Sequence, residues 1–138
     1  MKKLLGLDVG DVRIGVAVSE LGTMAFPLEV ITRDGTEWDR IASLVLEHDA
    51  VALIAGMPLS LDGTRKPQAQ KVQDFLDILS QKVSVPIHIV DERLTTSQAN
   101  RMLIAADRKS RERKKVVDQV AASLILQTYL DSHSGSLT

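Results

Sequence analysis

Carboxylates at three places in this sequence could together do chemistry, and the first of them, Asp8, is better placed for chemistry than for packing. Asp8 ends the apolar run at residues 4–7, where an ionised side chain is costly unless it is paired or coordinates a metal. Asp91 and Glu92 end a second apolar run, and Asp118 lies among the apolar residues of a third. Converging carboxylates repel one another unless their pKa values rise or a divalent cation occupies the site. These residues therefore predict a metal site.

The residue types also limit which metal could bind. The chain has no cysteine, so a metal must be held by oxygen or imidazole ligands. Oxygen ligands with open positions suit Mg²⁺ or Mn²⁺, as one ion or as a pair about 3.5–4 Å apart. Such ions activate water and neutralise a leaving phosphate oxygen. Phosphodiester hydrolysis is the reaction class that follows.

Each carboxylate also has a structural alternative. Asp8 could begin a turn with Gly10, since Asp before Gly is common in turns. Asp91 or Glu92 could form an ion pair with Arg93 or stabilise a turn. The two carboxylates are adjacent, and neighbouring strand residues point to opposite faces, so only one of them should face Asp8, and spacing does not select which. Asp118, expected in about the first turn of the last helix, could simply complement the helix dipole.

A dense run of basic residues precedes Asp118. The net charge of the chain is only −1, so it carries no global signature of nucleic-acid binding. The local run could hold a polyanionic substrate beside the metal site, although a solvated surface loop is the commoner fate of such a run. Its members are Arg101, Arg108, Lys109, Arg111, Arg113, Lys114 and Lys115.

The elements that must position these residues follow from hydrophobic periodicity. Short aliphatic runs predict strands at 3–8, 13–19, 28–32, 51–55 and 87–90. Helical spacing predicts helices over 69–79 and around 117–128, a helix that Thr36 can cap, and another that Thr95 or Thr96 caps. The basic run is expected to connect the last two helices. This order indicates an α/β fold with a mixed five-stranded sheet, antiparallel among its first three strands, and helices on both faces.

Right-handed crossovers would make the first, fourth and fifth strands parallel. Their carboxyl ends would then meet at one edge of the sheet, where open α/β sheets collect ligands. Asp8, Gly56 and the Asp91–Glu92 pair all fall at those ends.

The length of 138 residues fits one domain, expected over 1–131, with a flexible tail at 132–138. Asp8 interrupts the first apolar run far too early for a signal peptide, and no other run is long enough to cross a membrane. We therefore expect a soluble, cytoplasmic protein. The sequence does not choose between a monomer and a homodimer.

Four motifs in this order resemble the YqgF family, also described as the Holliday-junction-resolvase-like or pre-16S rRNA nuclease family. The resemblance runs from Leu4 to about Leu130. Its motifs are Leu7-Asp8-Val9-Gly10 with residues 13–17, Gly56-Met57-Pro58-Leu59 with residues 62–64, residues 91–96, and residues 114–118 with Ala121-Ala122.

The resemblance implies an RNase H-like fold and a catalytic, metal-binding set of Asp8, Glu92 and Asp118, with Glu92 rather than Asp91 facing the metal. It also implies a nuclease that matures the 5′ end of 16S ribosomal RNA. Val12 departs from the family, which often has a basic residue there, and Arg13 is expected to supply that charge. The expected nucleic-acid contacts are Arg13, Arg93, Arg108, Lys109, Arg111, Arg113, Lys114 and Lys115.

Three other functions compete with an RNA nuclease. A resolvase of branched DNA would use the same chemistry, and the 2′-OH would discriminate the two substrates. The Asp8-Val9-Gly10 turn before a hairpin also resembles the phosphate loop of actin-like ATPases, but those clamp nucleotide between two such domains. A non-catalytic RNA- or ribosome-binding module is the third alternative.

Overall fold

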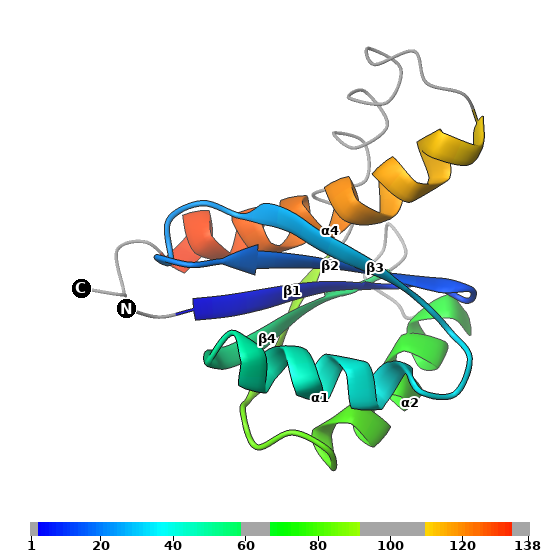
Figure 1. Ribbon diagram of the computed structural model, residues 1–138, viewed down its shortest axis with the longest axis horizontal. Coiled ribbons are helices and arrows are strands. Elements are labelled where there is room, and N and C mark those ends of the chain that lie inside the picture. Colours follow the sequence, from blue (N-terminus) through cyan, green and yellow to red (C-terminus); the bar gives the residue numbers. More distant parts are fainter. Residues whose placement is uncertain (1–2, 59–66, 92–109, 134–138) are drawn as a thin grey trace.

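Five strands form one mixed sheet in the order β3-β2-β1-β4-β5 (Figure 1). The structure, a computed structural model, describes residues 3–58, 67–91 and 110–133. The strands are β1 (Lys3–Val9), β2 (Arg13–Ser19), β3 (Phe26–Thr32), β4 (Ala50–Met57) and β5 (Ile87–Asp91); the described helices are α1 (Glu37–Glu47), α2 (Pro67–Ser80) and α4 (Ser110–His133).

The strand directions agree with the prediction. β1 pairs antiparallel with β2 and β2 with β3, whereas β1, β4 and β5 run parallel. β3 begins at Phe26, two residues before the predicted start, and includes Pro27. A proline is tolerated there because β3 is the outermost strand, where a missing N–H need not break a ladder. The helix expected after Thr95 lies outside the described residues.

Side chains of β1 alternate between two hydrophobic cores. Leu5, Leu7 and Val9 belong to the larger core, which α1 and α2 cover. Leu4 belongs to the smaller core, together with Ala122, Ile125, Leu126 and Leu130 of α4. Residues of β1 with even numbers therefore lie on the α4 face, and Asp8 is one of them.

The start of α1 differs from the expected cap. Thr36 stands at the N-cap position, but its side chain makes no capping hydrogen bond. Its hydroxyl instead donates to Asp34 Oδ1 at 2.6 Å, and its backbone N–H donates to the same oxygen at 2.9 Å. The competing local acceptor on Asp34 thus removes the threonine side chain from the helix end.

α4 crosses the sheet above β1 and runs opposite to it (Figure 1). A Cβ placed on Gly6 would lie 2.8 Å from Leu126 Cβ and 3.0 Å from the Ala122 carbonyl oxygen, so the glycine permits this close approach. Gln127 ties the same helix to the loop before β3: its Oε1 accepts from Ala25 N at 2.9 Å and its Nε2 donates to the Thr23 carbonyl at 3.2 Å.

Both ends of α4 depart from the sequence expectation. The helix begins at Ser110, well before the predicted start near Val117, and it continues to His133, so Ser132 and His133 of the expected tail are helical. Lys, Arg and Glu are good helix formers, but a run of them shows no apolar periodicity that would reveal a helix. Within the described residues, no helix combines the length and the apolar character that a membrane crossing requires.

Candidate active site

Asp8 lies near the carboxyl end of β1, at the centre of the sheet, and is half-buried. Its antiparallel partner on β2 is Gly15. In the parallel register of β1 and β4, Leu7 pairs with Ala55, so the next residue of β4, Gly56, lies beside Asp8. Because laterally paired residues share a face, the carboxylate has a residue without a side chain on either side. Glycine within strands often marks a site where a ligand or backbone approaches closely, so this signal was visible in the sequence.

The backbone of α4 brings position 118 to the level of Asp8. Ala122 lies over Gly6, and the helix runs opposite to β1. Going from residue 122 back to 118 advances about 6 Å along the helix. Going from Gly6 to Asp8 advances about 6.6 Å along the strand in the same direction. The prediction that Asp118 lies in the first turn of its helix is wrong, because α4 begins at Ser110 and position 118 is more than two turns inside it. An interaction with the helix dipole therefore does not explain this carboxylate, because that effect is limited to the first turn of a helix.

The third expected ligand, Glu92, lies outside the described residues, as does the Asp118 side chain. β5 ends at Asp91, which pairs in register with Met57 at the end of β4. His88 and Val90 of β5 contact the α4 side: the His88 ring stacks on Tyr129 at 5.5 Å, and Val90 joins the smaller core. The described part of the chain contains no group of three His, Asp or Glu side chains that could hold a metal ion.

The sequence predicted that the basic run connects the last two helices. In the structure, the part of the run from residue 111 onward belongs to α4 itself. Its members from Arg111 to Lys115 lie on the backbone of the first turns of α4. Figure 1 shows these turns rising away from the sheet above the edge where β1 ends. Arg13 is half-buried at the start of β2. Arg93, Arg108 and Lys109 lie outside the described residues, as do the side chains of Arg111, Arg113, Lys114 and Lys115.

The turn that follows Asp8 is held by a residue that the sequence did not single out, Arg33. Within the turn, Gly10 N donates to the Arg13 carbonyl at 3.0 Å, and a Cβ on Gly10 would lie 2.7 Å from that oxygen. From outside the turn, Arg33 Nη1 donates to the Gly10 carbonyl at 3.0 Å, and Arg33 N donates to the Val12 carbonyl at 2.9 Å. Arg33 therefore binds the turn at two backbone carbonyls, one through its side chain and one through its own backbone.

Glu37 orients the Arg33 guanidinium. Arg33 Nε donates to Glu37 Oε2 at 3.0 Å, and the Glu37 side chain is only 4% exposed. Burial by itself raises the pKa of the Glu37 carboxyl, but hydrogen bonds from the backbone N–H groups of Glu37 and Gly35 and from Arg33 outweigh it, so the net pKa lies below its ordinary value. The Arg33–Glu37 pair spans a chain reversal rather than a helix turn, so no periodicity pointed to it.

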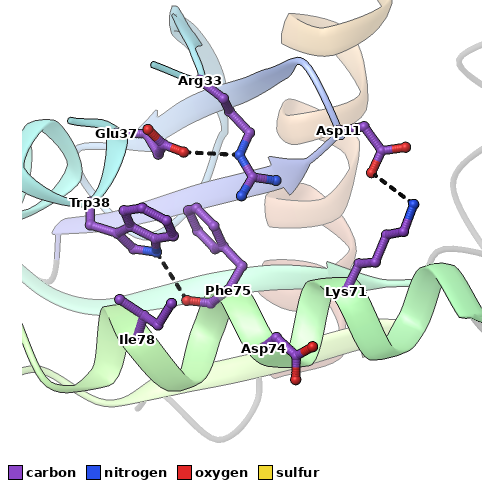
Figure 2. A pocket seen from close by; sticks show the side chains of 8 residues that line it. All are labelled: Asp11, Arg33, Glu37, Trp38, Lys71, Asp74, Phe75 and Ile78. Carbon is purple, nitrogen blue, oxygen red and sulfur yellow. Dashed lines mark hydrogen bonds and ion pairs between the residues drawn. The ribbon is translucent and has the colours of Figure 1, made fainter. Parts of the chain in front are cut away.

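These two residues line an open cleft of about 710 Å³ (Figure 2). Arg33 Cζ lies 4.9 Å from the centroid of the Phe75 ring, which itself stacks on Trp38 at 5.2 Å. At the far side, Lys71 Nζ reaches Asp11 Oδ1 at 3.7 Å. The cleft lies between the β1–β2 turn, the start of α1 and residues 71–78 of α2.

Comparison with known proteins identifies the family. The family model described as "RuvX: Holliday junction resolvase" matches residues 2–132. The chain belongs to this family. A protein of Desulforudis audaxviator, provisionally named pre-16S rRNA nuclease, is 46% identical over 133 residues, which cover 94% of each chain. A protein of the same name from Desulforamulus reducens is 47% identical over 133 residues, covering 94% of this chain and 97% of the relative.

Two solved structures show a fold similar to that of this chain. Thermus thermophilus RuvC in complex with a Holliday junction aligns with a TM-score of 0.59 at 15% identity, covering 99% of this chain and 98% of its own. The fowlpox virus resolvase aligns with a TM-score of 0.52 at 14% identity, covering 94% of this chain and 99% of its own. The RuvX-family chain thus has the RNase H-like fold and is a nuclease, an enzyme that acts on phosphodiester bonds.

Proposed function

We propose that this nuclease processes the 5′ end of pre-16S rRNA in the cytoplasm, using Mg²⁺ or Mn²⁺ held by Asp8, Glu92 and Asp118. The observation that carries the proposal is the position of Asp8 at the carboxyl edge of the sheet, between Gly15 and Gly56. The names of the relatives at 46–47% identity support the RNA substrate.

The backbone register supports the other two ligands. Position 118 of α4 reaches the level of Asp8 on the same face of the sheet. Strand alternation from His88 and Val90, which contact the α4 side, favours Glu92 over Asp91 as the third member. Three carboxylates on one face need a cation, because each ionised group raises the pKa values of the others.

The donor set fits a hard divalent cation. It consists of carboxylates alone, in a chain that has no cysteine. An ion of this kind, when bound, activates water and stabilises the charge on the leaving oxygen. Asp8 would be a ligand of this ion, and its backbone is held in place by β1, the central strand of the sheet. Gly15 and Gly56 would leave space at its sides for the phosphodiester, since neither presents a side chain on that face.

The basic turns of α4 would hold the nucleic-acid backbone. Arg111, Arg113, Lys114 and Lys115 precede position 118 on one continuous helix, so strand binding and the metal site would share a rigid element. Phosphate contacts of this kind add affinity that depends on salt and position the strand without reading its sequence.

The test is cleavage of a pre-16S rRNA fragment in the presence of Mg²⁺ or Mn²⁺. Asp8→Asn should lower the rate by more than about 100-fold, the scale on which one electrostatic group acts in an active site. Asp39→Asn is the matched control, because Asp39 is an exposed carboxylate of α1 whose ion pair with Lys82, at 3.2 Å, lies at the surface. Equal rates for wild type and Asp8→Asn, or no cleavage with either metal, would contradict the proposal.

Resolution of branched DNA is the second candidate, because the matching family model carries the description Holliday junction resolvase. The same carboxylates would cut either backbone, and contacts with the 2′-OH would decide between them. Parallel cleavage assays on the rRNA fragment and on a four-way DNA junction separate the two. Symmetric junction cutting would also require a homodimer, which sedimentation would detect, whereas rRNA cleavage is open to a monomer.

A further inference from the structure

The turn after Asp8 is anchored by a partly buried ion pair, Arg33–Glu37, that lies on the opposite side of the sheet from α4. Arg33 stands just after β3, and Glu37 is the first residue of α1. Both are far from Asp8 in the sequence, yet the Arg33 side chain reaches the Gly10 carbonyl, two residues beyond Asp8. The pair therefore connects the β3–α1 junction to the backbone that follows the proposed metal ligand.

We propose that Arg33, oriented by Glu37, is a positioning residue for Asp8: it fixes the Gly10 carbonyl and so holds the Asp8 carboxylate where a divalent cation can bind. This inference rests on the proposed function, in which Asp8 is a metal ligand. Arg33 touches neither substrate nor metal in this role and acts through the backbone of the turn.

The contacts leave the guanidinium little freedom. Its Nε is bound to Glu37 Oε2, and Glu37 Oε1 in turn accepts from Gly35 N at 2.6 Å, so both carboxylate oxygens are used. The guanidinium carbon lies over the Phe75 ring, and Trp38 Nε1 donates to the Phe75 carbonyl at 3.2 Å. Figure 2 shows the guanidinium beside the Glu37 carboxylate and close to the Phe75 ring, at the wall of the cleft. A group held in this way can restrain what it binds.

The geometry requires arginine. Arg33 Nε donates to the Glu37 carboxylate while Nη1 donates to the Gly10 carbonyl, so two donors of one planar guanidinium point to different acceptors. Lysine would keep the charge but offers a single ammonium on a flexible stem, which cannot reproduce both contacts. Without the second contact the turn still has the internal Gly10–Arg13 hydrogen bond, the Arg33 backbone bond to Val12 and the exposed contacts of Asp11 with α2, but no side chain of the described residues holds the Gly10 carbonyl in this way.

The cleft itself is not a strong candidate for a separate anion site. Among the described residues, the cations that line it both face carboxylates, Arg33 at Glu37 and Lys71 at Asp11. A third carboxylate, Asp74, also lines it. The charge arrangement therefore favours a support for the turn over a phosphate-binding pocket.

The experiment measures Mn²⁺ affinity by calorimetry on the full chain, together with the dependence of rRNA cleavage on metal concentration. Partners that orient a metal ligand typically change affinity or activity by 10–100-fold. Arg33→Lys should therefore weaken Mn²⁺ binding by about 10–100-fold and raise the metal concentration for half-maximal activity by a similar factor. Saturating metal should restore kcat to near the wild-type value.

Arg40→Lys is the matched control. Arg40 also joins α1 to β3, through hydrogen bonds to Glu29 at 3.0 and 2.7 Å, but it does not contact the turn. Its substitution should leave Mn²⁺ affinity unchanged. Glu37→Gln provides a second test if Arg33→Lys fails to fold, and it should weaken Mn²⁺ binding in the same direction by a smaller factor.

The outcomes separate the two proposals. Equal Mn²⁺ affinity in wild type and Asp8→Asn overturns the metal site, and the role of Arg33 with it. A site that is lost in Asp8→Asn but unchanged in Arg33→Lys and Glu37→Gln overturns only the positioning role. Weakened binding in Arg40→Lys to the same extent as in Arg33→Lys also overturns it, because the effect would then be general loosening of the β3–α1 junction.

Discussion

Gly6→Ala tests whether the seating of α4 on β1 sets the geometry of the proposed site. The added Cβ would meet Leu126 Cβ at 2.8 Å and the Ala122 carbonyl oxygen at 3.0 Å. Non-bonded carbon atoms prefer about 3.5–4.0 Å, so the helix must retreat by about 1 Å. Overpacking of this kind costs about 1–3 kcal/mol of folding free energy.

The same retreat should lower activity. Position 118 lies one turn from Ala122, so it would move relative to Asp8, and a misplacement of about 1 Å can cost about 100-fold in rate. The assay is cleavage of the pre-16S rRNA fragment at saturating metal, at a temperature where circular dichroism shows the variant to be folded.

Leu126→Ala is the control for loss of stability alone. Leu126 is fully buried in the same contact, and its truncation should cost about 2–5 kcal/mol without pushing the helix outward. Folded Leu126→Ala should therefore keep most of the wild-type rate. The reasoning is refuted if folded Gly6→Ala is as active as folded Leu126→Ala.

Two further predictions concern charge. The pKa of the Glu37 carboxyl lies below its ordinary value of 4.5, since its hydrogen-bond donors outweigh the opposing effect of burial. The folded state therefore binds this proton less tightly than the unfolded state, so the stabilisation is complete above about pH 4.5 and is lost as the pH falls through the lower folded pKa. Urea unfolding at a series of pH values should show this loss in the wild type, and an equal loss in Glu37→Gln would contradict it. For the basic turns of α4, replacing Lys114 and Lys115 by Gln should reduce the slope of log K against log salt by about 0.7–0.9 per lost phosphate contact, and a filter-binding series with an unchanged slope would count against their role.

Periodicity and turn chemistry were sufficient for most of the fold. Aliphatic runs located all five strands, and the order of strands and helices predicted which strands would be parallel. The errors occurred where local signals were weak or competed. The charged residues at 111–115 concealed the start of α4, and the Thr36 hydroxyl that was expected to cap α1 donates to Asp34 instead.

By itself, the sequence determined the residue types that the site can use: an apolar strand ending in Asp8, no cysteine, and motifs that resemble a nuclease family. Only the tertiary structure decided what surrounds Asp8. Strand register put Gly15 and Gly56 beside it, and the close approach at Gly6 set the level of α4. The pairing of β3 with β2, in which Thr32 lies opposite Arg13, brought Arg33 to the Gly10 carbonyl. These contacts join residues far apart in the chain, and a short-range pattern carries no signal for them because they arise only when the sheet and its two helical layers assemble.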